Sequence, residues 1–579
     1  MTDTTPTNDP ADTTPSNPPA ETTPVTQPAE TAPVAQPPGP QTPDAPPTPV
    51  PPGTAMRPVQ PPGQHPYRRP PVVPRRPSLL ERRWPAPVGG AQPAVLGAVV
   101  AAAAIGAVSI PLDRPGVGWL VSVLAGTGAL AATVRGAVRS GTTGAPDRTG
   151  TAARSRLSAE RLLWTVATIG LIGVGTVRAA GWLFVLCVLT AGVTAGLAVT
   201  DGRSVRGLLL SGVIVPAAVG RAVPWSVAGV GRGGGRVVGR TAITIAVSVA
   251  LLVVFGALFA SADPAFAHLL DAVVPTLSGA GLARGAFLFP IIGAGLLAAA
   301  FLLAAPPDLT GLETAASRRV RRLEWAAPVA LLDALFAAFV LVQVTHLFGG
   351  SDHVLATSGL TYAEYARGGF WQLLAVSVLT VLVIAAASRW APRQVRADRV
   401  LIRLLLGALA LLSLVVVASA LFRMDVYQQA YGFTRLRLLV SATELWLGLL
   451  FVLVLIAGIR LRAPWLPRLV IGTGVLALMG LAALNPDRLI ADRNIDRYFS
   501  TQRVDVWYLS QLSADAIPAL DRLPESLRHC AVTEIDRDLA RHRDGWREAN
   551  VARAQARRLL AANPLPDAEP DCYVSGSRG

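Results

Sequence analysis

Long apolar stretches separated by short polar loops recur along the chain from about residue 91 to residue 484. A helix needs about 20 apolar residues to cross a bilayer, and most of these stretches reach that length. The pattern therefore predicts an all-α polytopic membrane bundle with about 11 or 12 crossings. The predicted spans are 91–111, 117–134, 161–178, 180–200, 207–223, 241–260, 285–305, 326–348, 370–388, 402–421, 438–459 and 467–484.

Before this membrane domain, residues 86–484, lies a leader of different composition. Residues 1–85 are rich in Pro, Thr, Ala and Gln and contain few large apolar side chains. Such a segment cannot bury enough apolar surface to fold, so we predict a disordered leader.

The chain ends in a more polar tail, residues 485–579. Apolar residues recur at helical spacing over 505–523 and 531–562, which predicts a small soluble helical appendage. Trp546 and Leu559–Leu560 are the residues that we expect to supply part of its core.

The arginines predict how the bundle is oriented. Cytoplasmic loops hold an excess of basic residues, and Arg68–Arg83 therefore places the leader on the cytoplasmic side of the plasma membrane. The weakly basic loops 261–284 and 349–369 fall outside. The short stretch 207–223 is the exception, because a basic segment follows it directly. If it dips in and returns, about eleven crossings leave the tail outside, where a Cys530–Cys572 disulfide could form; if it crosses, there are about twelve.

Composition excludes several classes of function. Only 15% of the residues are charged, and the net charge of +15 comes from arginine clusters that flank apolar runs, which argues against nucleic acid as a partner. All 52 basic residues are arginine, so a phosphate-binding loop or a Schiff base that needs lysine is excluded. No cofactor is expected.

Two polar segments interrupt the apolar pattern, at 349–369 and 423–444, and both fall on the predicted outer face. Arginines there could hold an anionic lipid headgroup or solute, tyrosines could line the site, and an acid could orient an arginine or carry a proton. The candidate ligand-binding residues are Tyr362, Glu364, Tyr365, Arg423, Tyr427, Tyr431, Arg435, Arg437 and Glu444.

The spacing within the second segment carries this prediction. If 423–437 is one helix, Arg423, Tyr427, Tyr431 and Arg435 share a face, and Arg437 and Glu444 share another. Glu444 and Asp333 lie inside predicted spans and are therefore the two candidate buried acids. An interfacial belt of Tyr, Trp and Arg that only locks helices together is the competing interpretation.

A metal site is not expected. His346, His353 and Glu364 are ligand types that zinc accepts, but their spacing matches no short zinc motif.

The polar segments resemble the bacterial membrane proteins grouped as domain of unknown function 4153, and the related 4173. The resemblance rests on Thr361–Leu374, Arg423–Arg437, Asn485–Asn494 and Tyr508–Leu520, and it covers about residues 160–560. It implies an integral membrane protein of actinobacterial type, and it supplies no catalytic residue.

These observations favour a non-enzymatic membrane protein with a polar extracytoplasmic vestibule, in transport or in envelope sensing and assembly. Two alternatives stay open. One is a membrane-embedded transferase or hydrolase that acts on a lipid-linked substrate, with Glu364, Asp425 or Glu444 as acid or base. The other is a membrane scaffold whose leader and tail recruit partners.

Overall fold

The computed structural model describes part of the chain. It covers residues 84, 89–139, 151–200, 205–230, 279–306, 321–348, 370–393, 395–461, 463–566 and 572, with isolated residues between 251 and 266. The chain divides into two units, residues 1–75 and 76–579, and every described residue belongs to the second unit. The predictions for the leader and for the loop 349–369 therefore lie outside the described residues, except at Trp84.

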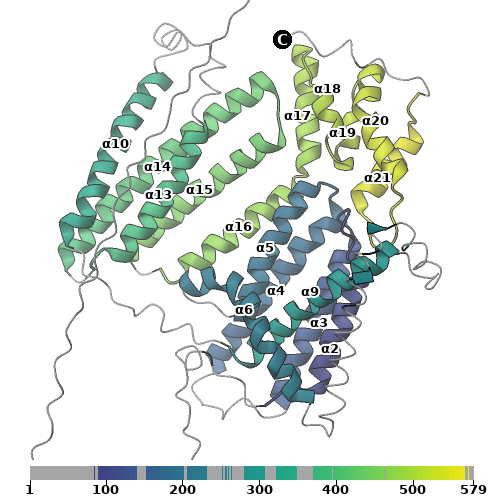
Figure 1. The fold of residues 1–579 in the computed structure, drawn as a ribbon. Helices are drawn as coiled ribbons and strands as arrows, with labels where there is room; N and C mark the ends of the chain where they lie inside the picture. Colours follow the sequence, from purple (N-terminus) through teal and green to yellow (C-terminus); the bar gives the residue numbers. More distant parts are fainter. Residues whose placement is uncertain are drawn as a thin grey trace, which may run out of the picture. The chain divides into compact units, whose positions relative to one another are not determined.

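All regular elements among the described residues are helices, which confirms the predicted all-α fold (Figure 1). The first group packs mainly through the pairs α2–α3, α4–α5, α2–α9 and α6–α9. Its helices are α2 (Pro93–Ser109), α3 (Val117–Arg139), α4 (Thr151–Val177), α5 (Gly181–Thr200), α6 (Val205–Val230) and α9 (Gly279–Ala304).

A second group of helices packs around α14. Leu409 and Phe451, both fully buried, lie in its apolar core. Helix α16 (Leu466–Ala483) follows this group and contacts α15 on one side and α4 and α5 on the other. The helices of the second group are α10 (Arg322–Phe348), α13 (Phe370–Trp390), α14 (Arg396–Tyr431) and α15 (Arg435–Arg460).

Nine of the described helices are long and apolar enough to cross a membrane, as the sequence predicts. They are α3, α4, α5, α9, α10, α13, α14, α15 and α16. Helix α2, at 17 residues, is apolar but shorter than these. At about 1.5 Å per residue, α14 is about 54 Å long and extends well beyond a hydrocarbon layer of about 30 Å.

Helix α6 corrects the prediction for 207–223. A dip and return within these residues is wrong, because Val205–Val230 forms one continuous helix. Arg221 donates to the Trp84 carbonyl at 2.8 Å, and the Ala91 amide donates to the Trp225 carbonyl at 3.1 Å. These contacts put the second half of α6 beside the start of α2. Its first residue follows the end of α5, at the same end of the bundle, so the contacts favour a helix that lies along this end without crossing.

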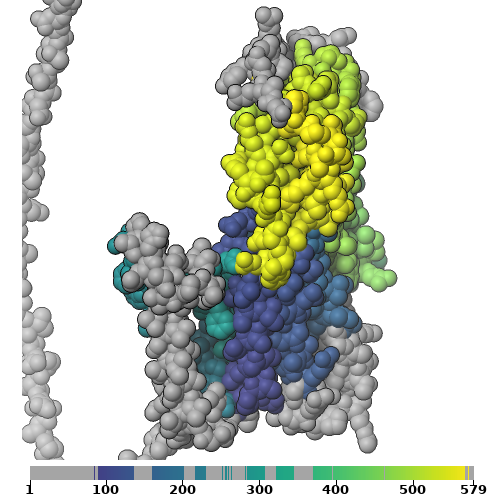
Figure 2. All heavy atoms as spheres, turned by 90° about the vertical axis from the view of Figure 1, so that its right-hand side faces the viewer, coloured from purple at the N-terminus to yellow at the C-terminus, as the bar shows by residue number. Residues whose placement is uncertain are grey.

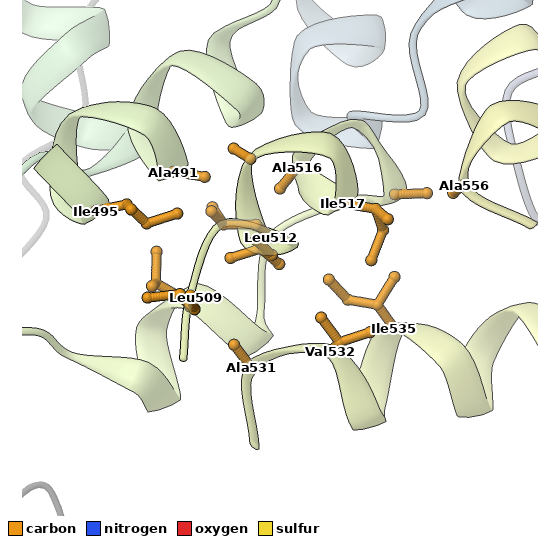
Figure 3. Close-up of a cluster of buried hydrophobic side chains, with 14 of the residues drawn as sticks. Ala491, Ile495, Leu509, Leu512, Ala516, Ile517, Ala531, Val532, Ile535 and Ala556 are labelled. Carbon is orange, nitrogen blue, oxygen red and sulfur yellow. The ribbon is translucent and has the colours of Figure 1, made fainter. Parts of the chain in front are cut away.

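The tail forms a compact helical appendage around its own apolar core (Figure 3). Ile490, Ile517 and Leu520 are fully buried in this core, and Leu560 is buried as predicted. Trp546 is 58% exposed, so the prediction that it belongs to the core is wrong. The elements are α17 (Pro486–Thr501), α18 (Val506–Ser510), the 3-10 turn η2 (Ala514–Ala516), α19 (Ile517–Leu520), α20 (Glu525–Arg541) and α21 (Val551–Ala562).

A disulfide joins Cys530, in α20, to Cys572, with the two Cα atoms 5.7 Å apart. The tail packs directly against the N-terminal helices, as the space-filling view shows (Figure 2). It contacts the chain where α2 meets α3, where α4 meets α5 and where α14 meets α15. We call this end of the bundle the tail end.

Candidate functional site

The second polar segment is broken by a turn at Gly432. Helix α14 ends at Tyr431 and α15 begins at Arg435, with the Thr434 hydroxyl accepting a hydrogen bond from the Arg437 amide at the start of α15. Gly432 has φ 83°, a conformation that glycine adopts without strain. The expected stripe of four residues on one helix is therefore wrong at its last member, Arg435.

The aromatic part of this segment packs as predicted for neighbours on a helix. The rings of Tyr427 and Tyr431 lie 4.9 Å apart, and the Arg437 guanidinium lies 4.3 Å from the centre of the Tyr427 ring. Arg437 also donates to the carbonyls of Tyr431, at 3.1 Å, and Gly432. These carbonyls belong to the end of α14, so Arg437 binds the C-terminus of one helix while it sits in the first turn of the next.

Arg435 leaves this segment and pairs with the tail. Its Nε and Nη2 donate to the two carboxylate oxygens of Asp487, in α17, at 2.9 and 2.5 Å. Asp487 is fully buried and also accepts from the Trp182 indole at 3.1 Å and from the Ser513 amide at 2.9 Å. Burial alone would raise the pKa of Asp487, but Arg435 and Ser513 outweigh it and hold that pKa below its ordinary range.

A second buried aspartate ties the tail to the other group of helices. One oxygen of Asp515 accepts from the amides of Ala179, at 2.7 Å, and Ala180, at 3.0 Å, directly before α5. It also accepts from the Ser513 hydroxyl at 3.0 Å. Burial raises the pKa of Asp515, and these donors only partly oppose that rise. Asp487 and Asp515, which we call the aspartate clasp, thus join α15 and α5 through the tail.

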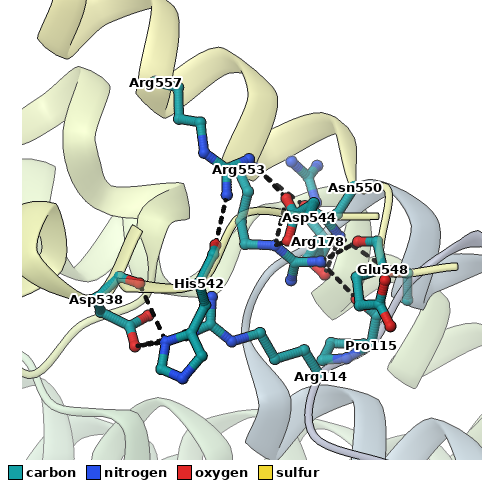
Figure 4. A network of polar contacts seen from close by, with 11 residues as sticks. Arg114, Pro115, Arg178, Asp538, His542, Asp544, Glu548, Asn550, Arg553 and Arg557 are labelled. Carbon is teal, nitrogen blue, oxygen red and sulfur yellow. Dashed lines mark hydrogen bonds and ion pairs between the residues drawn. The ribbon is translucent and has the colours of Figure 1, made fainter. Parts of the chain in front are cut away.

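The tail is attached at a third place, near the turn between α2 and α3 (Figure 4). Arg553 is 3% exposed; it bonds both oxygens of Asp544 at 3.0 Å and donates to the Pro115 carbonyl at 2.9 Å. Arg114 reaches from the same turn to Asp538 at 2.5 Å. Desolvation raises the pKa of Asp544 less than its arginine partners lower it, so its pKa lies below the ordinary range.

Glu444 lies deeper, within α15. It is 2% exposed, and the Ser377 hydroxyl of α13 donates to its Oε2 at 3.4 Å. Its Oε1 has no hydrogen-bond partner among the described residues. Ser441 lies one turn before it, donates to the Arg437 carbonyl at 3.0 Å and accepts from Gln428 at 3.2 Å. A line of polar groups therefore leads from the tail end of α15 to Glu444.

The profile of a family described as a domain of unknown function (DUF4153) matches residues 166–523. This match covers more than half of the chain. The chain belongs to this family. Comparison with curated proteins and with solved structures gave no match. The matched region of this DUF4153 protein includes Glu444 and both residues of the aspartate clasp.

The structure separates the nine predicted site residues of this DUF4153 protein. Tyr427, Tyr431 and Arg437 are in contact, whereas Arg435 turns to Asp487 and Glu444 lies about 13 Å further along α15. Arg423 lies in α14, two turns before its end. Tyr362, Glu364 and Tyr365 lie outside the described residues.

Sequence reasoning missed the clasp residues. The only local signal is Asn485-Pro-Asp487, a proline at the start of a helix followed by an acid in its first turn, which also fits an ordinary helix start. Asp333 lies inside a candidate span, and both of its carboxylate oxygens are shielded and lack partners among the described residues.

Metal centres and surface depressions are two other kinds of candidate site. Within the described residues, no group of three or more His, Cys, Asp or Glu side chains is placed to hold a metal ion. A depression of about 670 Å³ lies on the tail between α20 and α21, and Leu539, Leu560, Arg543 and Arg557 are among its lining residues. It lies in the tail, away from Glu444 in α15.

Proposed function

We propose that this protein binds a monovalent cation, either a proton or an alkali ion, at Glu444, in a transport-like or sensing role. The observation that carries this proposal is an acid buried in a membrane span with one oxygen lacking a partner among the described residues. Ionisable groups inside membrane spans are costly, and they commonly mark ion or proton paths. A carboxyl group in such a place is stabilised by taking up a proton or a cation.

The neighbouring arginines support a cationic rather than an anionic ligand. Arg435 is ion-paired with Asp487, and Arg437 binds backbone carbonyls and the Tyr427 ring. Their guanidinium groups already hold helices together. In this proposal, Tyr427, Tyr431 and Arg437 form the outer approach to Glu444, and an anionic lipid or solute becomes an outcome of the test.

Polar groups on neighbouring helices support a path to Glu444. Ser441 and Gln428 lie between the tail end of α15 and the acid, and Ser377 approaches it from α13. Hydroxyl and amide groups both donate and accept, so they can pass a proton or coordinate a partly dehydrated cation.

A hydrophobic carbodiimide tests this proposal without a known substrate. The reagent adds to a carboxyl group only when that group is protonated, and the adduct rearranges to a stable acylurea that mass spectrometry locates. We expect modification of Glu444 in the full chain in lipid nanodiscs, decreasing as the pH rises. Glu444→Gln should lose the label at this peptide, whereas Asp333→Asn is the matched control with an unchanged Glu444 and should keep it.

Protection of Glu444 from the carbodiimide by added ions identifies the ligand. If Na⁺, Li⁺ or K⁺ lowers the labelling rate at constant ionic strength, the ligand is an alkali ion. If pH alone controls it, the ligand is a proton. Protection by phosphate or by anionic lipid, with no effect of cations or pH, would point to an anionic ligand and contradict the proposal, as would a Glu444 that stays unlabelled while Asp333 reacts.

We further propose that the tail end faces the extracytoplasmic side. The Cys530–Cys572 disulfide supports this, because disulfides persist on the oxidising side of the membrane. The arginine distribution supports it independently, since it places the three turns that contact the tail outside. In intact cells, an impermeant reductant followed by an impermeant thiol reagent should label Cys530 and Cys572. Labelling only after lysis would place the tail inside.

A further inference from the structure

Four large apolar side chains of the tail are exposed among its described residues: Phe499 at 52%, Trp507 at 73%, Trp546 at 58% and Val551 at 59%. A single exposed apolar residue is ordinary on any protein surface, so exposure alone says little. Their positions relative to the membrane-spanning helices are more informative.

Trp507 lies beside a contact between the tail and α15. The next residue, Tyr508, accepts a hydrogen bond on its hydroxyl from the Arg435 amide at 2.7 Å. Arg435 is the first residue of α15, a helix long and apolar enough to cross a membrane, so this contact lies at the tail end of that helix. Trp507 is therefore held beside the tail end of α15.

Trp546 and Val551 are placed in the same way on the other group of helices. Arg547, next to Trp546, donates to the Val108 carbonyl at 3.2 Å near the end of α2, and its own carbonyl accepts from the Gly118 amide at 2.9 Å. Asn550, next to Val551, donates to the Gly175 and Arg178 carbonyls at 2.9 Å at the end of α4; it lies beside Arg178 in Figure 4.

Three exposed side chains thus each neighbour a residue that is bonded to the end of a membrane helix. We propose that Trp507, Trp546 and Val551, which we call the apolar rim, insert into the headgroup layer of the bilayer and bind the tail to the lipid surface. Tryptophan favours this layer because its ring is largely apolar while its indole N–H can bond to headgroups or water.

The bilayer is the occupant that these contacts support. The rim residues come from separate parts of the tail, and their neighbours attach to α15, to the α2–α3 turn and to α4. Each of these attachment points lies at the end of a candidate membrane helix, so in this proposal the same headgroup layer runs past all of them. A protein partner would have to reach several helix ends at once.

Phe499 provides a matched control. It is also more than half exposed, at 52%, but it follows Arg497 by two positions, about 200° around α17. Arg497 is the residue that bonds the end of α14, through the Gln429 and Ala430 carbonyls. Phe499 therefore points away from that contact.

The test uses the full chain in nanodiscs with single cysteines at positions 507, 546 and 499, on a Cys187→Ala background that keeps the Cys530–Cys572 disulfide. Each cysteine carries a polarity-sensitive fluorophore. We expect spin-labelled lipids to quench the probes of Trp507→Cys and Trp546→Cys more strongly than that of Phe499→Cys, and aqueous iodide to show the reverse order. The emission at 507 and 546 should also shift to shorter wavelength.

Equal iodide quenching at all three positions would overturn the proposal, because the rim would then face water. Protection from both quenchers at 507 and 546 would also overturn it and would indicate a protein cover, such as a second copy. If a labelled variant fails to fold, brominated lipids can be used with the unlabelled chain: Trp507→Phe and Trp546→Phe should each remove part of the lipid-quenched tryptophan emission. No change in that fraction would also refute the inference.

Discussion

Replacing Asp487 by asparagine should open the junction between the tail and α15. The carboxylate is fully buried and takes part in a two-point ion pair with Arg435. Removing one partner of a buried ion pair costs about 3–5 kcal/mol. The Arg435 side chain is 32% exposed, so its unpaired charge recovers part of its hydration. We therefore expect the lower end, about 3 kcal/mol.

Hydrogen exchange of the full chain in nanodiscs measures this opening locally. A loss of about 3 kcal/mol corresponds to roughly 160-fold faster exchange in α17 and in residues 513–516. The control is Asp492→Asn in the same helix, whose pair with Arg522 at 3.0 Å is partly exposed on both sides, at 32% and 44%. Such a pair contributes at most about 1 kcal/mol, or roughly fivefold. Similar exchange in the two variants would refute the reasoning that burial makes Asp487 important.

Three further predictions concern the tail and its attachment. Because burial raises the pKa of Asp515, the folded tail binds a proton at this residue more readily than the unfolded chain does, so the contribution of Asp515 to stability grows as the pH falls from neutral toward about 4; over this range the difference in melting temperature between the unchanged chain and Asp515→Asn should therefore shift in favour of the unchanged chain. Gly432→Ala should destabilise the α14–α15 turn by about 1–3 kcal/mol, measured by exchange at the turn, because alanine is strained at this φ and its Cβ would collide with Asn494. Cys530→Ser should lower the unfolding free energy of the tail by about 2–4 kcal/mol in denaturant titrations, whereas an unchanged midpoint would show that the disulfide lies outside the cooperative unit.

Much of this fold follows directly from hydropathy. A lipid-facing helix must be apolar over about 20 residues, so nine described candidate spans agree with stretches that are visible in the sequence. Hydropathy does not determine the placement of helix α6, because an amphipathic helix along the membrane surface and a short span differ little in length and composition. Only its contacts with Trp84 and Ala91 distinguish the two.

The candidate site was predictable where it depends on neighbours in one helix. Tyr427 and Tyr431 are in contact because they are four residues apart in one helix. The burial of Glu444 was predictable because an acid within an apolar span avoids lipid by facing the neighbouring helices. The partner of Arg435 was not predictable in this way. Asp487 is 52 positions away, and nothing in its local sequence distinguishes a clasp residue from an ordinary acid in the first turn of a helix.

Helix α15 carries both Arg435, which pairs with the aspartate clasp, and the buried acid Glu444. Arg435 fixes its first residue to the tail, and Glu444 lies nine positions later on the same rigid element, about 13 Å away. The other clasp residue, Asp515, fixes the tail to the start of α5, in the first group of helices. Any change in the position of α15 relative to α5 must therefore break one half of the aspartate clasp or deform the tail between Asp487 and Asp515. Under the proposed function, a change at Glu444 that moves α15 would therefore reach the tail through a single helix, which connects a buried acid directly to the tail end of the bundle.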